Sequence, residues 1–443
     1  MSRSTGRCAP ISIGLMSDLV SRHKDVIAPV IGFDTEIHAV KGEGIWITDA
    51  DGRRYADFAC GIAVTNLGHG HPAVVAAAHA QIDKLIHSGA IVRYDAIVEA
   101  AERLRDITPP GIEKFAFANG GAEAVEASVK LAKYVTGRQG VMVFRGSFHG
   151  RTMGSVSYTT SNARYRDGYH PMLGSVFVAP FPHPYRWGMS EDEATDHSLE
   201  ELRLVFKHVV SPQNISCFLV EPVQGEGGYY PAPARFLSEL RRLGDEHGIK
   251  LVYDEVQTGF GRTAEWFASD HFDAKPNILA MGKGIANGFP LSAYGASKEM
   301  IDAWPRGAHG TTFGGNPVAV AAAVAVMETL DGLLPHARDL SKHAFDLLGE
   351  VAERHPTVGD LRGLGLMIGL ELVTEPESRT PDADAFDYLK SFVQERELII
   401  IACGPDHNVI RFVPPLITTT DELEWAVDLV DQGLTSWEKS RAS

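Results

Sequence analysis

Two reactive side chains, an acid and a lysine, each follow an apolar stretch of this 443-residue chain. Asp254 comes after Leu-Val-Tyr at 251–253, and Lys283 comes shortly after the apolar stretch 277–281. A lysine amine can form a Schiff base with the aldehyde of pyridoxal phosphate (PLP), and a carboxylate can keep the cofactor's pyridine nitrogen protonated. Taken singly, Asp254 could be a loop cap and Lys283 a solvated lysine. Together with the features below, the pair predicts a PLP site.

Two loops supply groups that such a cofactor needs. Residues 119–123, Asn-Gly-Gly-Ala-Glu, lie between an expected strand and an expected helix, where successive N–H groups can bind a phosphate. Neither a dinucleotide-binding fingerprint nor a Walker A motif is present. Phe148 follows the next strand and could stack on a planar ring, although it could equally be a core residue. His149 could hydrogen-bond beside that ring.

The bulk composition limits the partners of the chain. A formal net charge of −16 argues against nucleic-acid and anionic membrane surfaces, so an anionic substrate needs local arginines. The four cysteines are far apart and no Cys-x-x-Cys pair occurs, so we expect no metal site, no disulfide framework and a cytoplasmic location. Arg3 and Arg7 are not followed by an apolar run, and no segment has 18 uninterrupted apolar residues, so we expect no signal peptide and no transmembrane helix.

The elements that must position these residues alternate between strand and helix patterns, which is typical of an α/β fold. Strands are predicted at 114–118, 141–144, 217–220 and 250–256, and helices at 122–135 and 234–247. A hairpin is predicted around Asp51-Gly52. Further along, helices are predicted at 318–330, 340–355 and 383–396, and strands at 366–372 and 398–401. We therefore predict an N-terminal arm with part of a small domain (1–70), a large PLP-binding domain (71–316) and a C-terminal small domain (317–443).

Several motifs, in order along the chain, resemble those of the class III PLP-dependent aminotransferases, and most closely those of 4-aminobutyrate aminotransferases. They lie at residues 57–64, 120–126, 148–152, 221–228, 254–263, 282–283, 312–317 and 403–411. The similarity extends from about Gly42 to about Leu434. It implies the fold type I of PLP-dependent transferases, with a mostly parallel seven-stranded sheet in the large domain and a smaller α/β domain.

The resemblance also implies a role for each cofactor-binding position. Lys283 would bind the cofactor aldehyde and Asp254 would pair with the ring nitrogen, so these two are the expected catalytic residues. Thr312 would reach the phosphate of the neighbouring subunit, which implies a homodimer or a pair of such dimers. Many relatives have Ser or Thr where this chain has Ala122, so only the backbone would serve there. The complete set is Gly121, Ala122, Phe148, His149, Asp254, Val256, Gln257, Lys283 and Thr312.

The implied reaction is a ping-pong transamination between an ω-amino acid, with 4-aminobutyrate as the expected donor, and 2-oxoglutarate. Arg151 would bind the distal carboxylate, and Arg411 would bind the α-carboxylate of 2-oxo and α-amino acids. Glu226 would mask Arg411 while an ω-amino acid is bound. The implied substrate-binding residues are Ile62, Arg151, Glu221, Glu226 and Arg411. Two alternatives remain open: an ornithine, N-acetylornithine or other ω-amine transaminase, and an amino-acid racemase or epimerase of the same fold.

Overall fold

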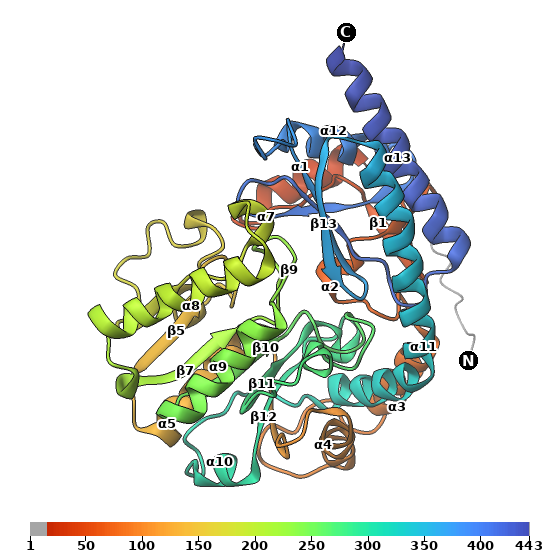
Figure 1. Cartoon of the computed structure of the whole chain (residues 1–443). Coiled ribbons are helices and arrows are strands. Elements are labelled where there is room, and N and C mark those ends of the chain that lie inside the picture. The colour runs from red at the N-terminus through yellow and green to blue at the C-terminus, as the bar shows by residue number, and fades with distance from the viewer. Residues whose placement is uncertain (1–15, 443) are drawn as a thin grey trace, which may run out of the picture.

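The computed structural model describes residues 16–442 and is built around a seven-stranded sheet with helices on both faces (Figure 1). Strands β11, β10, β7, β5 and β6 are parallel, whereas β12 is antiparallel to both of its neighbours. The predicted mostly parallel α/β sheet is confirmed. In spatial order the strands are β4 (Lys114–Ala118), β12 (Ser292–Ala296), β11 (Ile278–Met281), β10 (Lys250–Glu255), β7 (Ile215–Val220), β5 (Gly140–Phe144) and β6 (Val176–Ala179).

Both faces of this sheet are buried, which explains why its strands are almost uninterruptedly apolar. Val252 packs in the cluster beneath α5 (Gly121–Thr136), while its neighbours Leu251 and Tyr253 point into the main core on the opposite face. Helices α8 (Glu191–His208) and α9 (Ala234–His247) lie along that opposite face (Figure 1). The sheet is therefore a rigid platform whose carboxyl edge carries the loops after β5, β7, β10 and β11.

Two four-stranded sheets lie beside the large one, together with a two-stranded ribbon. The predicted hairpin is β2 and β3, and β3 also pairs in parallel with β15, which joins distant parts of the chain. The predicted strand 398–401 is wrong in extent, because β15 and β16 belong to different sheets. The strands are β1 (Ala39–Glu43), β2 (Trp46–Asp49), β3 (Arg54–Asp57), β15 (Leu398–Ile399); β13 (Val358–Leu364), β14 (Met367–Leu372), β17 (Val409–Phe412), β16 (Ile401–Cys403); and β8 (Val223–Gln224), β9 (Tyr230–Pro231).

Helix α11 (Pro317–Arg354) corrects another prediction, because the helices expected at 318–330 and 340–355 are one continuous 38-residue helix. It continues through Pro335 because Leu334, Ala337 and Leu340 keep its apolar face buried in the core. By length and composition this helix could cross a membrane, and it is the one such helix among residues 16–442. It packs against α3 (Pro72–Ile82) and α4 (Asp95–Ile107), as a core helix does.

The remaining α-helices are distributed along the chain. They are α1 (Met16–Val26), α2 (Cys60–Ala63), α6 (Met153–Tyr158), α7 (Pro184–Trp187), α10 (Lys298–Ala303), α12 (Ala383–Gln394) and α13 (Thr420–Ala442). The first fifteen residues of the predicted N-terminal arm, which include Arg3 and Arg7, lie outside the described residues. The domain bounds 1–70, 71–316 and 317–443 stay a prediction.

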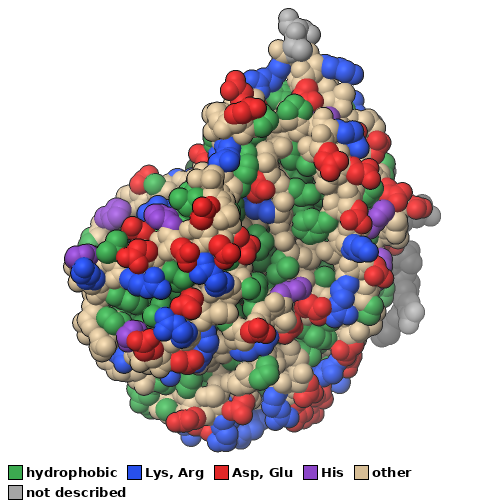
Figure 2. Space-filling model, in the orientation of Figure 1, with side chains coloured by type: hydrophobic (Ala, Val, Ile, Leu, Met, Phe, Trp, Pro, Cys, Tyr) green, Lys and Arg blue, Asp and Glu red, His purple; other side chains and the backbone are tan. Residues whose placement is uncertain are grey.

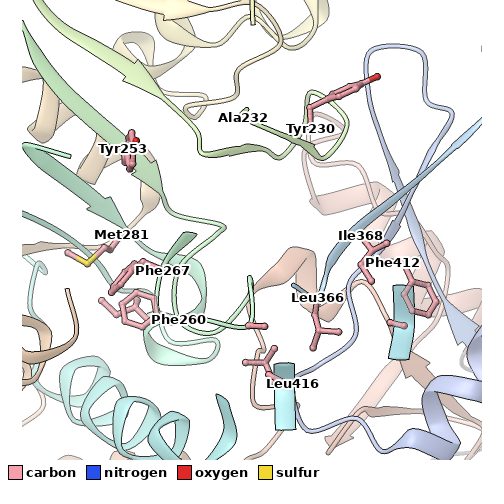
Figure 3. Close-up of a cluster of buried hydrophobic side chains, with 14 of the residues drawn as sticks. Tyr230, Ala232, Tyr253, Phe260, Phe267, Met281, Leu366, Ile368, Phe412 and Leu416 are labelled. Carbon is pink, nitrogen blue, oxygen red and sulfur yellow. The ribbon is translucent and has the colours of Figure 1, made fainter. Parts of the chain in front are cut away.

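One hydrophobic core joins the large sheet to the smaller sheets. Tyr253, Met281 and Phe260 belong to the same buried cluster as Ile368 and Phe412 of the β13–β14–β17–β16 sheet (Figure 3). On the face of the molecule in Figure 2, acidic and basic side chains are interspersed. The net negative charge is therefore not gathered into one patch on that face.

Candidate active site

Asp254 and Lys283 are brought together because their strands are neighbours. Strand β10 pairs in parallel with β11, with Asp254 opposite Ala280, so the residues that follow both strands emerge at the same edge of the sheet. Asp254 and Lys283 line one pocket of about 190 Å³. Seven of the other predicted residues line it too: Gly121, Ala122, Phe148, His149, Glu221, Val256 and Gln257.

Lys283 begins a short 3₁₀ turn (Lys283–Ala286) with a left-handed backbone, φ 44°. Burial, and then the charge of Arg411, lower the pKa of its amine to about 8. A buried lysine of this kind is more readily neutral, and therefore nucleophilic, than a solvated one.

Asp254 is held by a buried histidine. Its Oδ2 lies 2.8 Å from Nδ1 of His149, whose side chain is fully buried, and its Oδ1 accepts a hydrogen bond from the Val256 N–H at 3.1 Å. Among residues 16–442, Nε2 of His149 has no hydrogen-bond partner. The carboxylate is thus fixed in direction, as a group that must face one atom of a ligand needs to be.

The start of α5 provides the expected anion-binding backbone. The first N–H groups of a helix have no partner inside it, and the helix dipole is positive there. Gly121 must be glycine, because a Cβ at that position would lie 2.6 Å from Cγ1 of Val256. The backbone of Gly121 therefore packs directly against the Val256 side chain, which lines the same pocket.

Glu221 is buried and lines the pocket. Its two carboxylate oxygens accept hydrogen bonds from the N–H groups of Phe148 at 2.8 Å and Gly225 at 2.9 Å. Burial raises its pKa to about 7; His149 lowers it and Asp254 raises it further. Glu221 therefore ties the Phe148 loop to the segment that carries Glu226.

Arg411 and Glu226 form a buried ion pair. Arg411 lies on β17, and its guanidinium is 2.5 Å from Oε1 of Glu226; their side chains are 4% and 19% exposed. Burial alone would raise the pKa of Glu226, but the charge and hydrogen bond of Arg411 hold it below its usual value. The Arg411 guanidinium also lies over the Tyr229 ring, and the Tyr229 hydroxyl donates to Gln257 at 2.8 Å. The pair is thus linked to the Lys283 pocket.

Arg151 lies near the same ion pair but is exposed. Its guanidinium is 4.7 Å from the ring centre of Tyr165 and 5.9 Å from that of Phe148. The Tyr165 hydroxyl donates to Oε2 of Glu226 at 3.5 Å. Tyr165 thus connects the two arginines. Sequence reasoning missed it, because an isolated aromatic in a polar loop carries no signal of its own.

Five predicted residues do not line this pocket: Arg151, Glu226 and Arg411, described above, and also Ile62 and Thr312. Ile62 lies 49% exposed on α2, and Thr312 is exposed in the segment before α11. Thr312 was expected to reach a neighbouring subunit's site, and its position does not test that expectation.

Comparison with known proteins decides the family. The family model for class-III aminotransferases matches residues 32–434. This chain belongs to the class-III aminotransferases. The aminotransferase is 39% identical to a probable 4-aminobutyrate aminotransferase of Bacillus subtilis over 89% of this chain and 92% of that protein. It is 38% identical to a 4-aminobutyrate aminotransferase of Escherichia coli, over 94% and 97%.

Other relatives and solved structures widen that comparison. The aminotransferase is 36% identical to an alanine/serine racemase of Pyrococcus horikoshii, over 94% of this chain and 90% of that protein. A Bacillus anthracis aminotransferase has a TM-score of 0.89 at 27% identity, covering 96% of this chain and 100% of that one. An omega-transaminase from Thermomicrobium roseum has a TM-score of 0.88 at 28% identity, covering 96% and 99%. The predicted family is confirmed.

Proposed function

We propose that this aminotransferase holds pyridoxal 5′-phosphate in the Lys283 pocket. Three observations fit that group: a buried amine with a lowered pKa, a carboxylate fixed by His149, and a helix start where Gly121 leaves no room for a Cβ. When bound, the cofactor supplies an electron-withdrawing ring that makes a proton on the neighbouring substrate carbon removable. Lys283 would hold the cofactor aldehyde, and Asp254 would keep the ring nitrogen protonated.

The remaining pocket residues would orient the cofactor and move protons. Phe148 and Val256 would enclose the ring, Gln257 would face its phenolic oxygen, and the N–H groups of Gly121 and Ala122 would bind the phosphate. The amine of Lys283, once free, would take a proton from the substrate carbon and return it elsewhere as general base and acid. His149 would fix the orientation of Asp254.

We infer that the donor is an ω-amino acid, 4-aminobutyrate being the best candidate, and that the acceptor is 2-oxoglutarate. The observation that supports this most strongly is the Glu226–Arg411 ion pair. An enzyme with both substrates must hide one positive charge from the ω-amino acid and expose it to the α-carboxylate of the 2-oxo acid. A carboxylate that pairs with Arg411 and can move away does this. Arg151 would bind the distal carboxylate in both half-reactions.

The test is a pair of variants read in both half-reactions. Glu226→Ala leaves Arg411 without its partner, so the 4-aminobutyrate half-reaction should weaken, while glutamate is handled as well as before or better. Arg411→Ala should impair 2-oxoglutarate far more than 4-aminobutyrate. An unpaired buried charge costs about 3–5 kcal/mol, so Glu226→Gln, which keeps a polar partner, serves as the milder control. Equal slowing of both half-reactions in both variants would show a structural pair only.

A racemase is the second candidate, because the Pyrococcus horikoshii relative is named for that activity. The transaminase and racemase activities are distinguished by adding 4-aminobutyrate to the holoenzyme without any acceptor. A transaminase consumes one equivalent of donor and loses the visible absorption of its bound cofactor, whereas a racemase keeps it. Ornithine and N-acetylornithine added in the same assay test the other transaminase alternatives.

We further propose a cytoplasmic homodimer, or a pair of such dimers, with Thr312 contributing to the partner's phosphate site. Apolar side chains near Thr312 support a covered face: Ile91 is 91% exposed, and Ile86, Val92 and Phe313 are also exposed. The His87 and Phe313 rings lie 5.4 Å apart, so these segments form one patch. Exposed apolar patches of this kind are typical of subunit interfaces.

A further inference from the structure

Four consecutive residues between β3 and α3 have a left-handed backbone. The φ angles of Cys60, Gly61, Ile62 and Ala63 are 52°, 57°, 65° and 59°. The Val64 N–H donates to the Cys60 carbonyl at 2.7 Å, so the segment closes one left-handed helical turn. Only one of the four is glycine, and residues with a Cβ are destabilised in this conformation. Such strain persists only where the surroundings impose it.

Asp57, at the end of β3, holds the left-handed conformation of the turn from one side. Its side chain is buried; Oδ1 accepts a hydrogen bond from the Ala59 N–H at 3.1 Å, and Oδ2 accepts one from the Gly61 N–H at 3.0 Å. His69 lies on the same Oδ2 at 2.9 Å. One carboxylate therefore binds one backbone N–H inside the turn and one of the residue just before it, and is itself held in place by His69.

Arg262 holds the left-handed conformation of the turn from the other side. This fully buried guanidinium donates to Sγ of Cys60 at 3.2 Å and to Oδ1 of Asn66 at 2.7 Å. It also donates to the carbonyls of Leu366 and Pro414, at 3.1 and 2.8 Å. The base of the turn is thereby fixed to the chain segments beside the small sheets.

The turn shares a buried cluster with residues at the Lys283 pocket. Cys60 and Ala63 pack in the same buried cluster as Val223, which lines the Lys283 pocket, and Tyr229, which bonds to Gln257. Ile62 extends from this base with a half-exposed side chain. A right-handed or relaxed segment would direct the side chain of residue 62 elsewhere.

We propose that Asp57 is a positioning residue that holds this strained turn, fixes Ile62, and thereby sets which amino donors the enzyme accepts. The inference rests on the proposed function, because it requires an amino donor bound beside Lys283. Asp57 does not line the Lys283 pocket, so in this proposal it acts through Ile62.

The strain is tested by two alanines that differ in backbone conformation. Ala63 and Ala59 are both buried, at 1% and 6% exposure, but Ala59 has φ −87°. Glycine relieves strain only where φ is positive. Ala63→Gly should therefore melt higher than Ala59→Gly by about 2 °C or more. An Ala63→Gly variant that melts at or below Ala59→Gly would overturn the strained turn. This comparison does not depend on any substrate.

The positioning role is tested with Asp57→Asn, which keeps one acceptor oxygen and loses the other. Its matched control is Asp49→Asn, because Asp49 is also buried and also binds two backbone N–H groups, those of Asp51 at 3.0 Å and Arg53 at 2.8 Å, away from Ile62. The readout is the kcat/KM ratio of 4-aminobutyrate over 5-aminovalerate. Asp57→Asn should lower it about tenfold, the effect of a misplaced apolar contact; Asp49→Asn should leave it unchanged.

A double-mutant cycle separates positioning from general destabilisation. In an Ile62→Ala background, Asp57→Asn should no longer change the ratio. An equal change in both backgrounds, or no change in a folded Asp57→Asn, would overturn the proposal. If Asp57→Asn fails to fold, His69→Gln is the milder variant, with the same two outcomes. If the wild type is inactive with 4-aminobutyrate, the proposed function is overturned, and the same ratio is then measured between 5-aminovalerate and a second ω-amino donor that the wild type accepts.

Discussion

At the scale of single residues, burial changes what ordinary side chains can do. Lys283 and Asp254 could be predicted from the sequence because each follows an apolar strand, and parallel strands end at the same edge of a sheet. Tyr165 could not be predicted, because its contacts with Arg151 and Glu226 depend on a loop that no periodic pattern fixes. The raised pKa of Glu221 also depends on packing alone.

Lys283→Ala should keep the fold and lower transamination by at least about 10²–10⁴, the usual contribution of a positioned acid–base group. Borohydride reduction of the wild type with PLP, followed by peptide mapping, should label Lys283. Lys275→Ala is the matched control, since that lysine donates to the Ser269 carbonyl at 2.7 Å and does not line the Lys283 pocket. A label on another lysine would refute the assignment.

Glu221→Gln should change how stability depends on pH in the cofactor-free protein. The pKa of Glu221 is raised from 4.5 to about 7 by burial, so the folded protein binds its proton more tightly than the unfolded chain does. Its contribution to stability is full below about pH 4.5 and is lost as the pH rises to about 7. The melting temperature of Glu221→Gln relative to wild type should therefore rise across that window. The exposed Glu328→Gln is the control, and a flat difference would contradict the raised pKa.

At the scale of elements, the bounds of helices and strands could be predicted where a local sequence pattern coincides with burial. Helix α9 has the predicted bounds, and β4 also agrees, because each is a short segment with clear apolar spacing. Helix α11 differs from the two predicted helices because buried neighbours carry it past Pro335, a residue type that normally breaks a helix. The sequence predicts one strand at 398–401 because the change of sheet between β15 and β16 depends on distant partners, β3 and β17.

Gly121→Ala tests how the start of α5 fits against β10. The new Cβ would lie 2.6 Å from Cγ1 of Val256, so the Val256 side chain or the helix start must shift. Overpacking of this kind costs about 1–3 kcal/mol, and we expect PLP to bind at least about tenfold more weakly. Gly120→Ala is the control, because its Cβ would meet nothing within 4 Å. Equilibrium dialysis measures the affinity of each variant for PLP. Equal affinities would mean that the cofactor does not depend on this contact.

At the scale of the whole molecule, one chain leaves apolar surface uncovered near its candidate site. Ile91 is almost fully exposed and Phe313 is 61% exposed, next to Thr312. Burying such side chains is favourable, at about 25 cal/mol per Å² of apolar surface. In the proposed homodimer, a second copy related by two-fold symmetry would cover these side chains on both chains. A single sequence carries no such information, beyond the resemblance itself.

Mixed dimers test whether Thr312 serves the partner's site. Thr312→Arg should be inactive, because a long side chain would block the partner's phosphate position, and Lys283→Ala is inactive within its own chain. When the two are unfolded and refolded together, each hybrid dimer has one intact site, so activity should return to about a quarter of the wild-type value under random pairing. Lys283→Ala mixed with Asp254→Ala is the control. Both residues line one pocket of one chain, so that mixture should regain nothing. Hybrid dimers that form, as shown by differently tagged chains, yet stay inactive would place Thr312 outside the partner's site.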